Sequence, residues 1–126
     1  MNEDKLLEFK PLKKMQGNRE ICEFDDFLDS LPQKDKEKML LLIKNVEEKG
    51  LEVARRMEWV KKFDDGIFEL RSKVSSNIQR AMYFQRVGNE YIITHGFTKK
   101  SQKTPQKEID KAKRLRKLYE KGECIL

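Results

Sequence analysis

The sequence predicts an α+β protein in which helices pack on a small, twisted antiparallel sheet. Three observations support this fold class. Apolar residues recur at helical spacing within residues 33–49, three strand-like segments follow one another between residues 67 and 97, and a second helical stripe lies further along the chain. Short turns join the strand-like segments, so we expect them to pair as an antiparallel meander. Residues 1–126 have the length of a single domain.

The part of the chain before residue 33 predicts one strand and one short helix. Residues 6–12 (LLEFKPL) form a strand that Pro11 restricts to a sheet edge, because proline has no backbone N–H to donate. The Gly-Asn pair at residues 17–18 predicts a turn. Apolar residues at steps of mostly three and four predict a helix over residues 22–31, and Pro32 ends it.

The clearest helix is expected over residues 33–49. Its apolar residues follow the i, i+3, i+4, i+7 pattern of one helix face: Met39, Leu42, Ile43 and Val46. Gly50 then stands where a C-terminal cap residue is favoured. Residues 51–56 are expected to add a helical turn or a loop.

The central part of the chain changes to a period of two, which predicts strands. In residues 67–74 (IFELRSKV), apolar and polar side chains alternate, which predicts a half-buried strand whose polar face carries Glu69, Arg71 and Lys73. Residues 78–87 have a continuous apolar centre, typical of a strand covered on both faces. Residues 91–97 (YIITHGF) complete the meander. The turns that delimit these strands are expected at residues 65–66, 75–77 and 88–89.

A basic loop is expected over residues 98–104, followed by the last helix. Thr104 is the predicted N-cap and Pro105 the first helical residue, where the missing N–H costs nothing. Gly122 is predicted to end the helix. The apolar stripe of this helix consists of Ile109, Ala112, Leu115, Leu118 and Tyr119.

The charge is unevenly distributed along the chain. The net charge is +6, of which residues 1–50 contribute −2 and residues 51–126 contribute +8. A basic surface of this kind suits a polyanionic partner, most commonly a nucleic acid, or it is a solvated face without a partner. The charge alone does not decide between these two interpretations.

Composition and motifs limit the classes of function. No apolar run approaches the roughly 20 residues that span a bilayer, and the first residues lack a signal-peptide core, so we expect a cytoplasmic protein. Cys22 and Cys124 have no metal-ligand spacing, and no disulfide is expected between them. Motifs for phosphate-binding loops and zinc sites are absent, so we expect neither a cofactor nor a metal.

The feature most relevant to function is a group of cations on the predicted sheet. They are Arg71 and Lys73 on one strand, Arg80 at the start of the next, His95 near the end of the third, and Lys99, Lys100 and Lys103 in the following loop. Neighbouring strands lie about 4.8 Å apart, so these side chains are expected to converge on one region of one sheet face. Like charges this close are unfavourable unless an anion joins them, and an RNA phosphodiester is such an anion.

Such a group suits RNA cleavage by attack of a 2′-hydroxyl on the adjacent phosphate. The reaction needs a base for the hydroxyl, positive charge for the phosphorane that develops, and an acid for the leaving 5′-oxygen. Arginine supplies charge with bidentate geometry, and a histidine, or a lysine of lowered pKa, can move protons. No metal is required.

These residues also have purely structural interpretations. Arg71 could pair with Glu69, and His95, in phase with Tyr91, Ile93 and Phe97, could be a hydrogen-bonded core histidine. Lys99 and Lys100 could be ordinary loop lysines. Three aromatic residues are expected in the core rather than under stacked bases: Trp59, Phe63 and Tyr83.

Several ordered motifs resemble the RelE/ParE toxin superfamily and, more closely, its HigB-like, phage-derived branch. They are the Leu-Pro helix junction of EFDDFLDSLP, the Asp-Gly turn and E-L-R strand of DDGIFELRSK, the arginine that opens QRAMYF, and the passage GFTKKSQKTP into the last helix. The resemblance covers residues 6–121.

The resemblance implies a single-domain toxin of a type II toxin–antitoxin module. Most members of the superfamily cleave mRNA, typically in the ribosomal A site, and a protein antitoxin silences them; in the HigB-like branch it is usually a helix-turn-helix DNA-binding protein. The resemblance implies that Arg71 and Arg80 bind phosphate and stabilise the transition state. Lys100 or Lys99 would donate a proton or contact phosphate, and His95 would be a further catalytic residue. The expected RNA contacts are Lys73, Lys99 and Lys103.

One departure from the superfamily concerns the general base. Several RelE relatives carry a tyrosine shortly after the basic loop, whereas this chain has Thr104-Pro105 there and no tyrosine before Tyr119. Either another group is the base, or catalysis is mainly electrostatic, or activity is lower. Two alternative functions stay open: a ParE-like inhibitor of DNA gyrase, and a non-enzymatic RNA-binding or regulatory domain. The group of cations favours the endoribonuclease.

Overall fold

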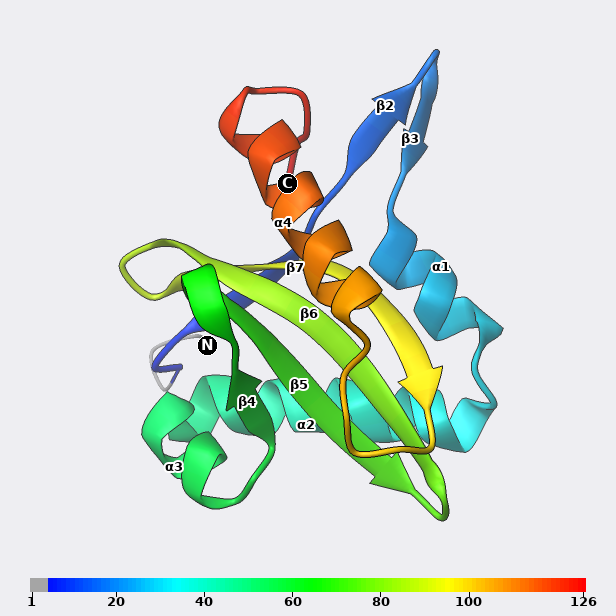
Figure 1. Cartoon of the computed structure of the whole chain (residues 1–126), viewed down its shortest axis with the longest axis vertical. Coiled ribbons are helices and arrows are strands. Elements are labelled where there is room, and N and C mark those ends of the chain that lie inside the picture. Colours follow the sequence, from blue (N-terminus) through cyan, green and yellow to red (C-terminus); the bar gives the residue numbers. More distant parts are fainter. Residues whose placement is uncertain (1–4) are drawn as a thin grey trace.

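A computed structural model describes residues 5–126 and has a five-stranded sheet at its centre (Figure 1). The strand order is β1-β7-β6-β5-β4, with bounds Glu8–Pro11 (β1), Glu90–Lys99 (β7), Asn77–Val87 (β6), Ile67–Val74 (β5) and Val60–Lys62 (β4). From β4 to β7 all pairs are antiparallel, which confirms the predicted meander. The edge position of β1 is also confirmed, although β1 pairs in parallel with β7.

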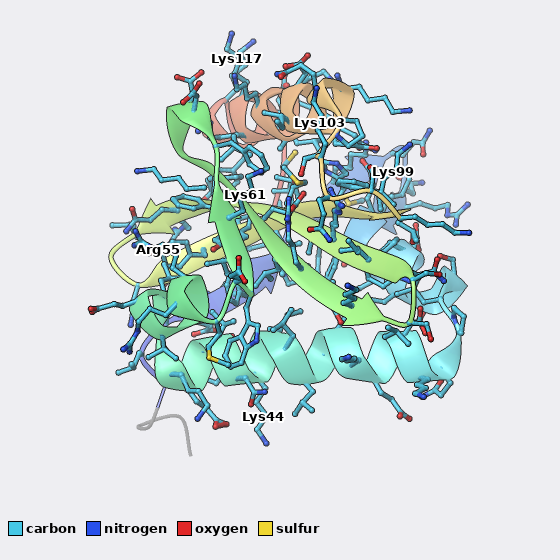
Figure 2. All side chains as sticks on the ribbon, turned by 60° about the horizontal axis from the view of Figure 1, so that its bottom comes forward. Lys44, Arg55, Lys61, Lys99, Lys103 and Lys117 are labelled. Atoms are coloured by element: carbon cyan, nitrogen blue, oxygen red, sulfur yellow. The ribbon has the colours of Figure 1, made fainter. Side chains whose placement is uncertain are left out.

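The helices lie on both sides of this sheet. Their bounds are Glu23–Ser30 (α1), Gln33–Lys49 (α2), Leu51–Arg56 (α3) and Gln106–Glu120 (α4). Figure 2 shows α2 below the sheet and α4 above it. A separate hairpin, β2 (Lys14–Gln16) and β3 (Arg19–Ile21), is formed around the predicted turn at residues 17–18 and projects away from the sheet (Figure 1). No helix within residues 5–126 is long and apolar enough to cross a membrane.

Two apolar clusters hold the layers together, one on each sheet face. The helices α1, α2 and α3 cover a cluster that includes Phe24, Met39, Val46, Leu70, Ala81 and Tyr83. Helix α4 covers a second cluster that includes Ile67, Met82, Phe84, Ile92, Ile109 and Leu115. Strand β6 contributes to both clusters, so the prediction of a strand buried on both faces is confirmed.

Because both faces of the sheet are covered, the prediction of a solvent-exposed polar face on β5 is wrong for most of the strand. Its polar face was predicted to meet solvent, but the side chain of Glu69 has no exposed surface and that of Arg71 is only 17% exposed. Lys73, nearer the end of the strand, is exposed as predicted. The reason is tertiary: α4 and the loop that precedes it lie over this face, which a strand period cannot reveal.

The start of α4 also differs from the prediction. Pro105 is the N-cap, with extended backbone angles of φ −61° and ψ 138°, and the helix begins at Gln106. Thr104 therefore precedes the cap and makes no capping hydrogen bond. Its hydroxyl donates instead to Glu69 Oε2 at 2.6 Å, so the fold uses this side chain to join the loop to β5.

Candidate functional site

The two predicted arginines lie opposite each other on neighbouring strands. Arg71 on β5 is the register partner of Arg80 on β6, so these two of the predicted cations do lie close together. The anion between them belongs to the protein itself: Arg71 Nε is paired with Glu69 Oε1, and Arg80 Nη1 lies 3.8 Å from Glu69 Oε2. The interpretation that Arg71 pairs with Glu69 is thus confirmed. The buried carboxylate lowers the repulsion between the two guanidinium groups.

The loop before α4 completes this network by supplying acceptors. Arg80 Nη1 donates to Thr104 Oγ1 at 3.1 Å, and its Nη2 donates to the carbonyl oxygen of Ser101. Arg71 Nη2 donates to the carbonyl oxygen of Gln102 at 2.9 Å. The loop therefore lies over both arginines and contacts each of them through its backbone.

Arg80 is entirely enclosed by these contacts. Its side chain has no exposed surface, and its Nε is one of the buried polar atoms that have no hydrogen-bond partner within residues 5–126. Burial lowers the pKa of the guanidinium, and the charge of Arg71 lowers it further, while Glu69 raises it. Contact between Arg80 and a phosphate would require the Ser101–Thr104 stretch of the loop to move.

The accessible part of the site is a groove beside β5, with a volume of about 470 Å³. It forms because β4 is short: the last ladder pair is Val60 with Leu70, and one more hydrogen bond joins Arg71 N to Trp59 O at 2.8 Å. Beyond that point the edge of β5 has no strand partner within the described chain. We call this cavity the β5 groove; its lining residues are Lys38, Leu41, Leu42, Asn45, Met57, Glu58, Trp59, Arg71, Ser72, Lys73, Ile78 and Gln102.

The β5 groove is lined by cations and by a set of apolar residues that we call its apolar side. Three cations line the groove, Lys38 from α2 and Arg71 and Lys73 from β5, and the Lys38 ammonium donates to the carbonyl oxygen of Lys73. Glu58 is the one carboxylate among the lining residues. The apolar side consists of Leu41, Met57 and Trp59 with the buried Leu42 beneath. The groove therefore suits a ligand that carries both an anionic group and an apolar group.

Glu58 reaches the groove through an unusual backbone conformation. It has φ 60°, in the left-handed region that favours glycine, directly after the C-cap Met57 of α3. The amide of Trp59 then bonds back to the carbonyl oxygen of Ala54 at 2.9 Å, which closes the helix end. A carboxylate held at a strained position in a groove is a candidate for function, because strain persists where the fold over-determines it.

His95 lies in a different environment from the arginines. It is 2% exposed, its Nε2 is 3.1 Å from Glu108 Oε1 of α4, and its Nδ1 is 2.9 Å from Thr94 Oγ1. Burial lowers the pKa of the imidazole, the charge of Lys111 lowers it further, and Glu108 opposes them. The interpretation as a buried, hydrogen-bonded histidine is confirmed.

The prediction that His95 is in phase with Phe97 is confirmed, but the predicted phase with Tyr91 and Ile93 is wrong. Tyr91 and Ile93 belong to the cluster under α2, whereas His95 meets α4 and lies beside the ring of Phe97. The register with β6 shifts between the Met82–His95 pair and the Tyr83–Ile93 pair, so one additional residue is accommodated there. This bulge, which alternation in the sequence does not reveal, turns His95 toward α4.

The loop was expected to begin at residue 98, but β7 continues to Lys99, so only Lys100 and Lys103 lie in the loop. All three lysines are exposed, and none forms an ion pair with another residue of the described chain. Figure 2 shows Lys99 and Lys103 on the same side of the molecule, between α4 and the end of β7. Of the predicted site residues, only Arg71 and Lys73 line the β5 groove.

Sequence reasoning missed several residues of the site. The pairing of Glu69 with Arg71 was one of the structural interpretations, but its contact with Arg80 was not predicted, although two arginines opposite each other need a counter-charge. No pattern in the sequence indicated a role for Lys38, Glu58 or Ser72, because their place in the groove depends on how α2 and α3 pack against β5. No group of three or more His, Cys, Asp or Glu residues that could hold a metal is found in residues 5–126.

The fold and site define a class of protein: a small basic α+β domain with paired arginines on neighbouring strands and a cationic groove at an open sheet edge. The chain belongs to the phage derived protein Gp49-like family, whose sequence profile matches residues 26–117. This family is RelE-like and is associated with the toxins of toxin–antitoxin modules. A comparison with curated proteins found no match. The matched segment contains every residue that lines the β5 groove.

Proposed function

We propose that this protein is the toxin of a HigB-like type II module and a metal-independent endoribonuclease that cleaves mRNA at the ribosome. The observation that carries the proposal is the β5 groove, in which three cations lie with one carboxylate. The cations suit a phosphodiester and its developing charge, and the carboxylate suits proton abstraction. We further propose that a helix-turn-helix antitoxin binds and silences the protein.

Arg71 is the proposed main phosphate ligand. Its guanidinium is partly exposed in the groove, and Glu69 fixes its Nε, which leaves the Nη groups to exchange the loop acceptor Gln102 for phosphate oxygens. Lys38 and Lys73 add charge on the same side. Charge fixed in advance in this way stabilises the transition state without reorganisation during the reaction.

Glu58 is the proposed general base, a role that the sequence had left unassigned. In the proposed step, Glu58 takes the proton of the 2′-hydroxyl, and O2′ forms a bond to phosphorus. The bond from phosphorus to O5′ breaks, and O5′ takes a proton from Lys100 or Lys99. Neither lysine lines the β5 groove in this structure, so this step requires the chain around them to move toward the groove. The products are a 2′,3′-cyclic phosphate and a free 5′-hydroxyl. The step therefore consumes no water and requires no metal.

Arg80 has the role of a positioning residue in this proposal. It is buried beneath the loop and holds Glu69 and Thr104, which in turn hold Arg71. Lys99 and Lys103 are the proposed contacts to flanking phosphates. His95 is assigned to the stability of the α4 packing rather than to the reaction, because both ring nitrogens are engaged away from the groove.

The test is to induce the protein in cells and map new 5′-hydroxyl RNA ends by sequencing. We expect discrete cuts within translated messages, reduced about 100-fold or more by Arg71→Ala or Glu58→Gln. Lys44→Ala is the matched control, since Lys44 projects from α2 away from the sheet (Figure 2). Growth arrest with DNA damage and intact RNA would instead identify a gyrase inhibitor, and the absence of both effects would leave an RNA-binding domain.

A further inference from the structure

We propose that the apolar side of the β5 groove is a nucleobase subsite, so that the protein selects the base beside the bond it cleaves. The inference rests on the proposed function and adds a substrate contact to the same groove. The residues assigned to the subsite are Leu41, Asn45, Met57, Trp59 and Ser72. The cations that line the same groove hold the phosphate of that nucleotide.

The first observation is exposed apolar surface at the groove. Leu41 of α2 and Met57, the C-cap of α3, are each 56% exposed, whereas Met39, Val46 and Ala54 of the same helices have no exposed surface. Trp59 is half-buried next to them and presents part of its ring. A flat base covers such surface well, and stacking of one base on an aromatic ring such as that of Trp59 strengthens binding about 5- to 150-fold.

The second observation is unused hydrogen-bonding capacity in the groove lining. Ser72 is 3% exposed, and its hydroxyl oxygen has no hydrogen-bond partner within residues 5–126. Buried hydroxyls are normally paired, so an orphan in a groove lining points to a ligand atom. The side-chain amide of Asn45 also lines the groove, and amides pair with the edges of bases.

The third observation is size, which favours a nucleotide over a protein segment. A volume of about 470 Å³ falls in the range of small-molecule sites. An amphipathic helix of a partner, about 10 Å across, would need a longer groove with apolar anchors on successive turns. Here three cations, Lys38, Arg71 and Lys73, line the same short cavity as the apolar anchors, which suits a nucleotide with its phosphate better than an apolar helix face.

The experiment uses the purified full chain and a fluorescent 2′-O-methyl RNA, in which the attacking hydroxyl is blocked. One base at a time is removed along the strand, and the Kd is measured for each abasic probe. We expect one position at which loss of the base weakens binding about 5- to 150-fold. In Met57→Ala and Leu41→Ala, the intact probe should bind more weakly, and loss of that base should have less effect. Leu40→Ala, an exposed α2 residue outside the groove lining, should behave as wild type.

Cleavage of unmodified RNA, measured in parallel, separates the subsite from the proposed function. If the protein cleaves RNA but no position depends on its base, the subsite is overturned while the nuclease stands. If the protein neither binds nor cleaves RNA, both are overturned. If Met57→Ala and Leu41→Ala weaken only the binding of the antitoxin, the groove belongs to a protein partner and the subsite is likewise overturned.

Discussion

At the scale of single residues, Glu69 governs the electrostatics of the site. Its carboxylate is fully buried between two guanidinium groups and also accepts the hydroxyl of Thr104. A buried charge is tolerated only when it is paired, so the two arginines and Glu69 stabilise one another as a set. Two positive charges against one negative charge leave an excess of one, next to a groove proposed to bind phosphate.

The importance of Glu69 can be measured with an isosteric change. Glu69→Gln keeps the shape of the side chain but leaves Arg80 buried without its counter-charge, and we expect a loss of about 3–5 kcal/mol in the free energy of unfolding. Urea denaturation followed by circular dichroism would measure it. Glu90→Gln, which removes a carboxylate paired with Arg86 near the surface, is the control and should change little. Equal effects of the two variants would contradict the account of Glu69.

Glu58 illustrates a conflict between stability and function. The backbone of Glu58 has φ 60°, which is strained for a residue with a Cβ atom. Glycine relieves this strain, so Glu58→Gly should raise the free energy of unfolding by about 1 kcal/mol. The same change should abolish cleavage if Glu58 is the base. Ser75→Gly is a matched control, because Ser75 has φ 54° in the exposed turn between β5 and β6. It should stabilise the protein similarly, measured as Tm, and leave cleavage intact. A Glu58→Gly variant that cuts RNA at the wild-type rate would exclude Glu58 as the base.

At the scale of elements, α4 is joined to the rest of the fold by polar contacts at its N-terminal half. Glu108 meets His95 of β7, and Lys111 pairs with Glu23 of α1 at 2.6 Å. Burial raises the pKa of the Glu23 carboxyl, but the hydrogen bonds and charges of Lys111 and Lys14 outweigh it, so the pKa is lowered. These contacts make the position of α4 sensitive to pH.

The pH dependence follows from His95. Its pKa is lowered on folding, so the unfolded chain binds the proton more tightly, and protonation favours unfolding. The contribution of neutral His95 to stability is complete above the unfolded pKa of about 6.5 and is lost as pH falls through the lower folded value. We therefore expect the Tm of the wild type to fall more steeply than that of His95→Gln between about pH 7 and pH 5. If Tm falls equally with pH in the wild type and in His95→Gln, protonation of His95 does not destabilise the fold.

The elements that the sequence predicts well are those with a long regular period. The predicted bounds of residues 33–49 and 67–74 are those of α2 and β5, because many residues contribute to each pattern. Strand β4 has three residues and gives no period, so it was missed, as was the hairpin of β2 and β3. Their pairing depends on neighbours in space. The β5 groove could not be predicted for the same reason, since it exists where β4 stops.

At the scale of the whole molecule, charge is concentrated where RNA is proposed to bind. Each lysine that neutralises a phosphate of a single strand contributes about −0.7 to the slope of log K against log salt. We expect Lys38→Ala and Lys73→Ala each to reduce the steepness of that slope by about 0.7 for the 2′-O-methyl RNA. Lys44→Ala should leave the slope unchanged, because Lys44 points away from the sheet (Figure 2). A uniform decrease in all three variants would indicate nonspecific attraction without a defined contact.

The parallel pairing of β1 with β7 has a consequence for synthesis of the chain. During translation, β1 emerges early but finds its partner only when Glu90–Lys99 has left the exit tunnel. The loop over Arg71 and Arg80 emerges later still. A nascent chain therefore cannot complete this sheet, or cover the two arginines, before these later segments have emerged.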